Sequence, residues 1–204
     1  MTTLNDVIIP WEWLIKMYAH NGIMTADGNV KKELGLVQVY TGNGKGKTTA
    51  ALGLSLRAIG NGLSVAMVQF MKSDQETGEY RMSKELNGFT LIPCGLPPLV
   101  DPKNPTDGDK AAAREALDIA KELLYSGKFD LFIMDEVNVA MGWKLIDPKE
   151  VIGILKGRPK NTEVVLTGRY VPDDIVAFAD LVTEMKMIKH PYDKGIGPRK
   201  GIES

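Results

Sequence analysis

The chain has 204 residues and a formal charge of −1 at pH 7, with 44% hydrophobic and 25% charged residues. This is ordinary globular usage, which excludes wholesale disorder, and the balanced charge provides no general field for holding a nucleic acid. The single cysteine, Cys94, excludes an internal disulfide, a four-cysteine zinc site and a cysteine-ligated iron–sulfur cluster.

The first 34 residues differ from the remainder of the chain. They hold two of the three tryptophans, Trp11 and Trp13, among other apolar residues, and they lack the basic start of a secretory signal. We predict an N-terminal extension over residues 1–34, either a helix packed on the main domain or a flap over a site or a dimer contact. Residues 35–204 are predicted to form one domain. Since no apolar run is long enough to cross a membrane, we expect a cytoplasmic protein.

From Gly35 onward, short apolar strands alternate with helices. Strands are predicted at 36–40, 63–70, 89–92, 129–134, 163–166 and 181–185, and helices at 46–60, 107–125, 148–156 and 172–178. The helix at 46–60 is apolar nearly all round, which predicts a buried helix, and the five prolines within 93–105 predict a loop. This alternation predicts an α/β fold with a mostly parallel sheet and helices on both faces. Ligands of such sheets bind at the carboxyl ends of the strands.

A glycine-rich turn joins the first strand to the first helix and matches a P-loop. Its residues, all candidates for nucleotide binding, are Thr41, Gly42, Asn43, Gly44, Lys45, Gly46, Lys47, Thr48 and Thr49. Backbone N–H groups and the helix N-terminus would bind phosphate oxygens, Lys47 would supply a charge, and the Thr48 hydroxyl could bind Mg²⁺. Thr41 stands where the usual pattern has glycine, and Lys45 is either a second phosphate contact or a solvated side chain. The motif favours a P-loop NTPase fold of the RecA-like type.

The strand at 129–134 ends in two carboxylates, Asp135 and Glu136, as in a Walker B motif. One carboxylate would position Mg²⁺ directly or through water, and the other would orient a water or bind a nucleotide hydroxyl; a helix-capping role is the alternative. Arg169 follows the fifth strand and therefore points to the same edge, where it is a candidate phosphate ligand or a surface ion pair. Arg57, farther along the P-loop helix, is a similar candidate.

These residues alone indicate a protein that binds a magnesium nucleotide. The sequence further resembles the P-loop family of ATP:corrinoid adenosyltransferases, and the threonine at position 41 belongs to the motif of that family. The matching stretches, in order along residues 35–203, are Thr41–Thr48, Val68–Lys72, Met134–Glu136, Arg158–Pro159, Val164–Arg169, Ala179–Met185, Lys189–Asp193 and Lys200–Ile202.

The resemblance implies a reaction in which a Co(I) corrinoid attacks C5′ of ATP and expels triphosphate, with ATP bound in reversed polarity. It also implies roles for the loop, in which Gly42 to Thr49 bind the triphosphate and Lys47 neutralises it. Thr48 and Glu136 would hold Mg²⁺ (or Mn²⁺), with Asp135 in support, so that Lys47 and Glu136 are the catalytic candidates. The family further implies an external flavoprotein reductant and a homodimer.

One loop departs from the family pattern. Leu96 and Pro98 stand where the family has phenylalanine and tryptophan, so they can supply apolar contact with the corrinoid but no ring face. Two other functions therefore stay open at this point. One is an ordinary P-loop ATPase or kinase that attacks phosphorus and leaves ADP. The other is a non-catalytic module that binds nucleotide or corrinoid.

Overall fold

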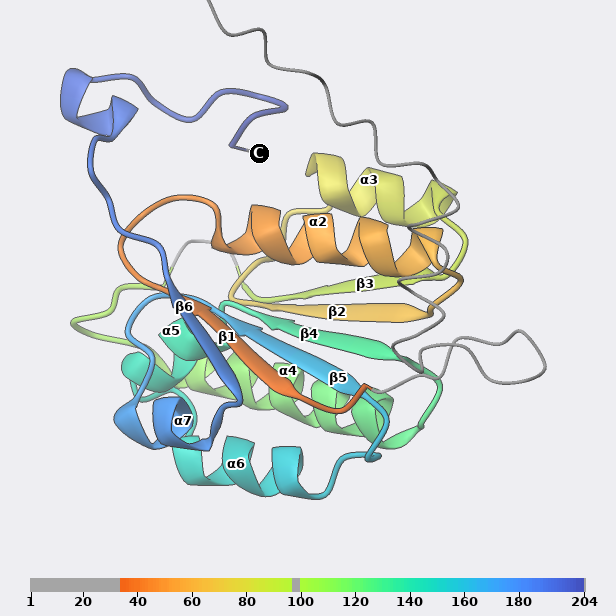
Figure 1. Ribbon diagram of the computed structural model, residues 1–204. Helices are drawn as coiled ribbons and strands as arrows, with labels where there is room; N and C mark the ends of the chain where they lie inside the picture. Colours follow the sequence, from red (N-terminus) through yellow and green to blue (C-terminus); the bar gives the residue numbers. More distant parts are fainter. Residues whose placement is uncertain (1–33, 97–99, 204) are drawn as a thin grey trace, which may run out of the picture. The chain divides into compact units, whose positions relative to one another are not determined.

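The computed structural model describes residues 34–96 and 100–203, and these form a six-stranded sheet with helices on both faces (Figure 1). Trp11 and Trp13 of the predicted extension, and Pro98 of the departing loop, lie outside the described residues. The strands are β1 (Val37–Thr41), β2 (Val65–Phe70), β3 (Phe89–Cys94), β4 (Leu131–Asp135), β5 (Glu163–Thr167) and β6 (Leu181–Glu184).

All five strand pairs are parallel and the strand order is β3-β2-β4-β5-β1-β6. Strand β5 therefore lies between β1, which leads into the glycine-rich turn, and β4, which ends in the carboxylates. The register pairs Gln69 with Asp135, and Tyr40 with Thr167. The polar strand ends consequently meet at one edge, and the predicted α/β fold with a parallel sheet and helices on both faces is confirmed.

Helices cover the sheet unequally. Helices α2 (Lys47–Gly60) and α3 (Gly78–Glu85) lie on one face. The other face carries α4 (Asp107–Tyr125), α5 (Val137–Gly142), α6 (Pro148–Lys156) and α7 (Asp173–Phe178) (Figure 1). Each face has its own core of buried apolar side chains. Helix α4 starts with a capping box formed by Thr106 and Asp109. No helix in these described ranges is long and apolar enough to cross a membrane.

Helix α2 contradicts one expectation, because it is not buried on all sides. Only Lys47, Ala51, Ser55 and Ala58 are buried, whereas the Leu56 side chain is 64% exposed. Leu52, Leu56 and Ile59 line a pocket, and Leu52 and Ile59 also pack against the core on this face. Strand β3 also runs farther than predicted, through Pro93 to Cys94. A proline is tolerated there because β3 is an edge strand and its missing N–H breaks no ladder.

Candidate nucleotide-binding site

The glycine-rich turn is shaped by two glycines in the left-handed region and by the start of α2. Gly42 has φ +96° and Gly46 has φ +116°, conformations that residues with a side chain rarely adopt. Helix α2 begins at Lys47, and no side chain caps its first turn. The first N–H groups of a helix have no partner within it, and they carry the positive end of its dipole. This turn is therefore prepared to bind an anion such as a phosphate.

Lys47 spans the turn from within. Its ammonium donates to the carbonyl oxygens of Gly42 at 2.9 Å and Gly44 at 2.7 Å. Burial lowers the pKa of Lys47, and the nearby charge of Arg169 lowers it further, whereas the Glu136 and Asp135 carboxylates oppose this shift. A buried ammonium held on two carbonyls is a compact positive charge at the floor of the turn.

The chain after β6 supports the turn from the side. The Met185 carbonyl accepts from the N–H of Gly44 at 2.7 Å, and the Met185 N–H donates to the carbonyl of Thr41 at 2.8 Å. A Cβ on Gly42 would lie 2.5 Å from the Met185 oxygen, and one on Gly44 would lie 2.7 Å from it. Glycine is therefore required at both positions, because the chain at Met185 lies too close for a side chain. The N–H of Gly44 already donates to Met185 and is not free to bind a phosphate.

Asp135 is fully buried at the end of β4, and four side chains surround its carboxylate. One oxygen, Oδ1, accepts from the hydroxyls of Thr48 at 2.8 Å and Thr167 at 2.6 Å. The other, Oδ2, accepts from the amide of Gln69 at 3.2 Å and the ammonium of Lys72 at 2.7 Å. The carboxylate thus ties together α2, β5, β2 and the turn that follows β2.

Glu136 differs from its neighbour in both backbone and surroundings. It has φ +62°, stands at the N-cap position of α5 without a side-chain capping hydrogen bond, and donates its N–H to the Thr167 hydroxyl at 2.9 Å. Its carboxylate lines the pocket, and burial together with the Asp135 charge raises the pKa of Glu136. The cations Lys72, Lys47 and Arg169 act against this shift. A carboxylate of raised pKa among cations in a pocket is a common feature of functional sites.

Unusual backbone conformations gather at the same edge of the sheet. In the described ranges, four residues other than glycine have positive φ, and two of them, Met71 and Glu136, directly follow strands β2 and β4. A third, Tyr170, follows Arg169 after β5. Such conformations are costly and cluster where a fold positions functional groups.

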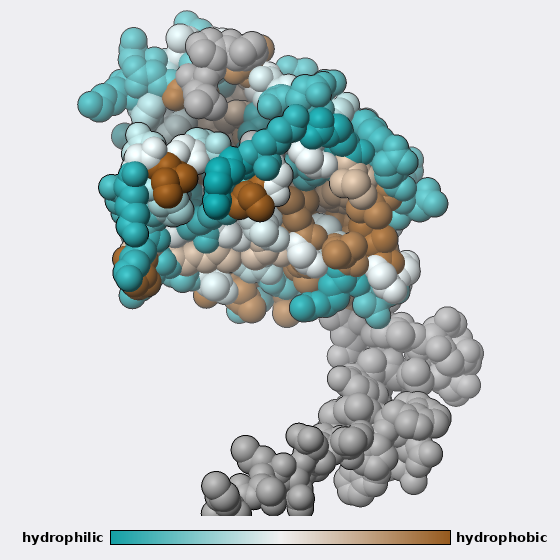
Figure 2. Space-filling view, turned by 90° about the horizontal axis from the view of Figure 1, so that it is seen from above, coloured by the Kyte–Doolittle hydropathy of each residue, from teal (hydrophilic) through white to brown (hydrophobic). Residues whose placement is uncertain are grey.

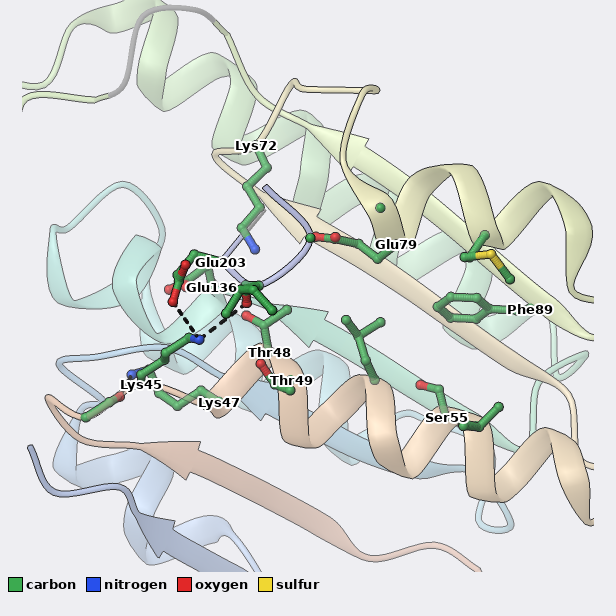
Figure 3. A pocket seen from close by; sticks show the side chains of 18 of the residues that line it. Lys45, Lys47, Thr48, Thr49, Ser55, Lys72, Glu79, Phe89, Glu136 and Glu203 are labelled. Carbon is green, nitrogen blue, oxygen red and sulfur yellow. Dashed lines mark hydrogen bonds and ion pairs between the residues drawn. The ribbon is translucent and has the colours of Figure 1, made fainter. Parts of the chain in front are cut away.

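A pocket of about 740 Å³ opens over this edge, within the usual size of small-molecule sites. Its polar end holds the turn, Glu136, Arg169 and Lys72. Figure 3 shows the lysine side chains converging on this end from two directions, Lys72 from one and Lys45 with Lys47 from another. The other end runs along α2 toward α3 and is apolar, and Figure 2 shows apolar side chains around a hollow on that face. The apolar lining residues are Leu52, Leu56, Ile59, Met82, Leu86 and Phe89.

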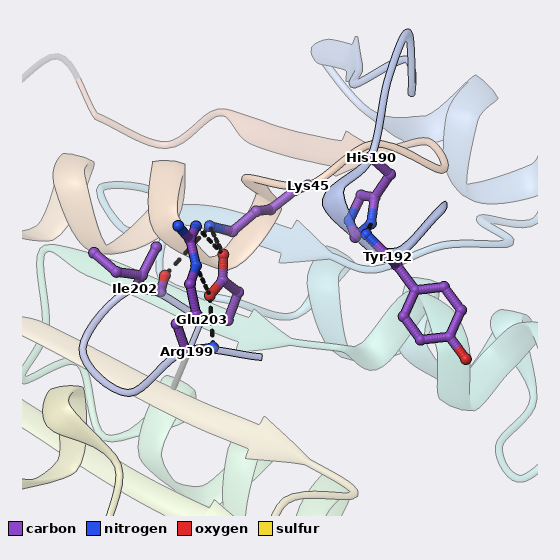
Figure 4. Close-up of polar contacts among 6 residues, drawn as sticks. All are labelled: Lys45, His190, Tyr192, Arg199, Ile202 and Glu203. Atoms are coloured by element: carbon purple, nitrogen blue, oxygen red, sulfur yellow. Dashed lines mark hydrogen bonds and ion pairs between the residues drawn. The ribbon is translucent and has the colours of Figure 1, made fainter. Parts of the chain in front are cut away.

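The C-terminal segment closes one side of the polar end. After a 3-10 helix at Pro191–Lys194 the chain returns to the turn, where the Lys45 ammonium donates to the Glu203 carboxylate at 3.1 Å and to the Ile202 carbonyl at 3.3 Å (Figure 4). Arg199 donates to Glu203 through its guanidinium and its N–H. These hydrogen bonds, Arg199 first, lower the pKa of Glu203 to about 2. The ionised Glu203 carboxylate thus lies beside the glycine-rich turn.

Most of the predicted site residues meet in this pocket. Those that line it are Gly44, Lys45, Gly46, Lys47, Thr48, Thr49, Glu136 and Arg169. Thr41, Gly42 and Asn43 belong to the turn but do not line the pocket, and Asp135 lies behind the lining residues.

The structure does not bring Arg57 into the pocket. It is exposed on α2, and its charge acts on Tyr40. Its role in nucleotide binding stays a prediction. Leu96 is 51% exposed and does not line the pocket either.

Sequence reasoning assigned no role to Gln69, Lys72, Thr167 or Glu203. Gln69 is a polar residue in an otherwise apolar strand, and Thr167 ends another strand at the same edge, which are signals that could have identified both. The contact of Glu203 with the turn joins residues 158 positions apart, and no local pattern predicts it.

The protein groups at the polar end are suited to Mg²⁺ that arrives with a nucleotide. Among the described residues no group of three or more His, Cys, Asp or Glu side chains could hold a metal ion. Mg²⁺ commonly takes one or two protein oxygens and completes its shell with phosphate oxygens and water. The Glu136 carboxylate and the Thr48 hydroxyl, both lining the pocket beside the turn, fit that requirement.

Residues 33–204 match the family described as ATP:corrinoid adenosyltransferase BtuR/CobO/CobP. A corrinoid adenosyltransferase of Sinorhizobium sp is 39% identical over 84% of this chain and 81% of its own length. The corrinoid adenosyltransferase of Escherichia coli K12 is 38% identical over 84% and 86%, and the one of Salmonella typhimurium, CobA, is 35% identical over 85% and 87%. A solved structure, the flagellar accessory protein FlaH from Methanocaldococcus jannaschii, aligns with 74% of this chain and 70% of its own at 13% identity and a TM-score of 0.48.

The match covers the whole described domain, including the turn, both carboxylates and the C-terminal segment that returns to the pocket. The chain therefore belongs to the family of ATP:corrinoid adenosyltransferases.

Proposed function

We propose that this protein transfers the 5′-deoxyadenosyl group of ATP to the cobalt of a reduced corrinoid. The electron pair of Co(I) forms the cobalt–carbon bond to C5′, and the C5′–O5′ pair leaves with triphosphate. The supporting observation is that Lys47, Thr48 and Glu136 meet at the polar end of one pocket, in a chain of this family.

The turn and its lysines stabilise the leaving group in this proposal. Negative charge grows on the triphosphate as the C5′–O5′ bond breaks, and fixed donors aimed at developing charge lower the barrier. The N-terminus of α2 and the Lys47 ammonium supply such donors, and Arg169 adds a cation on the pocket wall. ATP lies with its triphosphate on the turn and its ribose toward the open side, so that C5′ faces the corrinoid.

Mg²⁺ would neutralise part of the charge on the triphosphate when it is bound. We propose that Thr48 and Glu136 hold it and that Asp135 supports them. The family further suggests an external flavoprotein as the source of electrons and a homodimer as the assembly. These three points rest on the resemblance and on the donor set at the polar end.

Analysis of the phosphate product tests this function. Purified protein is incubated without oxygen with ATP, Mg²⁺ and a chemically reduced corrinoid, and the products are separated. Formation of a light-sensitive alkylcobalt corrinoid with one triphosphate per turnover supports the proposal. Release of ADP with an unchanged corrinoid would instead identify an ATPase or kinase, and tight binding without any product would identify a binding module.

The Lys47→Ala variant locates the triphosphate. Without the ammonium on the floor of the turn, we expect adenosyl transfer to fall by at least about a hundredfold, the effect of removing one strong donor at developing charge. Transfer at a near-normal rate would contradict the placement of the triphosphate on this turn. The matched control is Lys160→Ala, because Lys160 is an exposed lysine that does not line the pocket.

A further inference from the structure

Every lone-pair direction of the buried Asp135 carboxylate is taken by a hydrogen bond. A carboxylate offers about four lone-pair directions, and Asp135 uses them for Thr48, Thr167, Gln69 and Lys72. Glu136, the next residue, has no hydrogen bond to its carboxylate among the described residues, and this carboxylate lines the pocket. The two carboxylates of the motif are therefore unequal before any ligand binds.

Lys72 is the one cation among the four partners of Asp135, and the backbone fixes its position. Its N–H donates to the Cys94 carbonyl at 3.2 Å, at the end of β3. A Cβ on Gly95 would lie 2.6 Å from the backbone nitrogen of Lys72, so the chain after β3 and the chain after β2 are in close contact there. The positive φ of Met71 turns the chain just before the lysine. The Lys72 side chain then extends into the pocket toward the carboxylates (Figure 3).

The charge balance explains why a cation is needed at this place. A fully buried carboxylate is strongly destabilised unless a counter-charge and hydrogen bonds compensate it. Burial alone would lower the pKa of Lys72, but the charge and hydrogen bond of Asp135, with smaller contributions from the Glu136 and Glu79 charges, together outweigh it and raise that pKa. The ammonium thus stays charged, and the Lys72 side chain, which is 32% exposed, lines the pocket while it holds Asp135.

We infer that Lys72 is a positioning residue that keeps Asp135 as a hydrogen-bonding hub, so that Glu136 alone of the two carboxylates binds the divalent cation. The inference rests on the proposed function for its relevance to the reaction. By occupying Oδ2, Lys72 prevents Asp135 from binding a metal ion itself, and through the hub it orients the Thr48 hydroxyl and the strand end that carries Glu136.

Direct metal binding to the complex with ATP tests this role without corrinoid and without turnover. Mn²⁺ is used as the probe, by electron paramagnetic resonance or calorimetry. Removing the ammonium in Lys72→Met leaves the Asp135 charge without its cation, and we expect Mn²⁺ affinity to rise by about tenfold or more, because a nearby positive charge is lost and a carboxylate oxygen becomes free to bind the metal. The double variant Lys72→Met/Asp135→Asn should return to the wild-type affinity. If Lys72→Met binds Mn²⁺ as the wild type does, or if the double variant keeps the gain, the inference is wrong.

Kinetics separate positioning from a general structural effect. In Lys72→Met we expect kcat of adenosyl transfer to fall by about 10- to 100-fold while KM for ATP changes by less than about threefold. Lys72→Arg, which keeps a charge near Asp135, should restore most of kcat. An equal loss in both variants would contradict the role of the charge.

A second comparison remains decisive if Lys72→Met does not fold. In the complex with ATP, Glu136→Gln, which removes a ligand of the metal, should weaken Mn²⁺ binding more than Asp135→Asn, which removes only the carboxylate that supports Thr48. The opposite order would show that Asp135 is the ligand and would overturn the inference. Since metal binding is measured apart from turnover, failure of this inference and failure of the proposed reaction can be told apart.

Discussion

The contact between the glycine-rich turn and the chain after β6 allows a sharp comparison of two glycines. Gly44 is buried in the turn, where an added Cβ would lie 2.7 Å from the Met185 oxygen and 2.9 Å from two backbone atoms of Lys186. Gly53 lies exposed in the interior of α2, and an added Cβ would meet nothing within 4 Å. The same substitution, glycine to alanine, should therefore have opposite effects at the two positions.

The magnitudes follow from these surroundings. Gly53→Ala should stabilise the protein by about 0.5–1 kcal/mol, because alanine restricts the unfolded chain and favours the helix. Gly44→Ala forces backbone atoms apart, which costs about 1–3 kcal/mol, and weakens the 2.7 Å hydrogen bond from Gly44 to Met185, worth about 0.5–1.5 kcal/mol. At about 2–4 °C per kcal/mol for a chain of this size, Gly53→Ala should raise Tm by about 1–4 °C and Gly44→Ala should lower it by at least about 3 °C.

Differential scanning calorimetry measures both shifts, and calorimetric titration with ATP and Mg²⁺ measures binding. A displaced turn should weaken ATP binding in Gly44→Ala by about tenfold or more, since each 1.4 kcal/mol is a factor of about ten, while Gly53→Ala should bind as the wild type does. If Gly44→Ala lowers Tm but leaves the Kd for ATP unchanged, the segment at Met185 moves and the turn does not. The segment would then not be what holds the turn in shape.

Three further predictions concern titration, the thiol and the C-terminal segment. Because the pKa of Glu136 is raised and Mg²⁺ binds the ionised form, Mg²⁺ affinity in the ATP complex should start to fall at a higher pH than for an ordinary glutamate as the pH is lowered, and Glu136→Gln should flatten this dependence in a metal titration. Burial, with a smaller effect of Glu115, raises the pKa of Cys94 from 9.0 to about 11. Alkylation of the folded protein near pH 8 should therefore be roughly 100-fold slower than in guanidinium, and equal rates would contradict this burial. Glu203→Gln removes a negative charge beside Lys45 and should therefore tighten ATP binding roughly two- to fivefold. The control Glu122→Gln, at an exposed position on α4, should have no effect. Weaker ATP binding in Glu203→Gln would show that this carboxylate assists nucleotide binding.

The parts of the site that local sequence determines could be predicted. The turn at 41–49 carries its own signal, since glycines, a lysine and threonines follow a strand and open a helix within nine residues. The carboxylates at the end of β4 were recognisable for the same reason. Parallel strands then bring both motifs to one edge without any further information.

The helical period explains two of the differences. An α-helix turns by about 100° per residue, so Arg57 is rotated by about 100° from Leu56 and by about 140° from Leu52 and leaves the stripe that faces the pocket. Leu52, Leu56 and Ile59 do lie on that stripe. Their apolar character predicted burial, but sequence alone cannot distinguish a core from the lining of a pocket, since both favour the same side chains.

Contacts between distant segments could not be predicted. The pairing of Lys72 with Asp135 depends on a turn with positive φ at Met71 and on the close approach of the end of β3. Neither Lys72 nor Gln69 carries a local pattern that names its partner. Helix α3 was not predicted either, because its eight residues are mostly polar and give only a weak apolar stripe.

The return of the chain to Lys45 has a practical consequence for handling the protein. A label attached at Glu203, such as a fluorophore, would lie beside Lys45 at the polar end of the pocket, where the proposed function places the triphosphate. Such a label would report nucleotide entry with high sensitivity, and for the same reason it would alter the kinetics of any preparation that carries it.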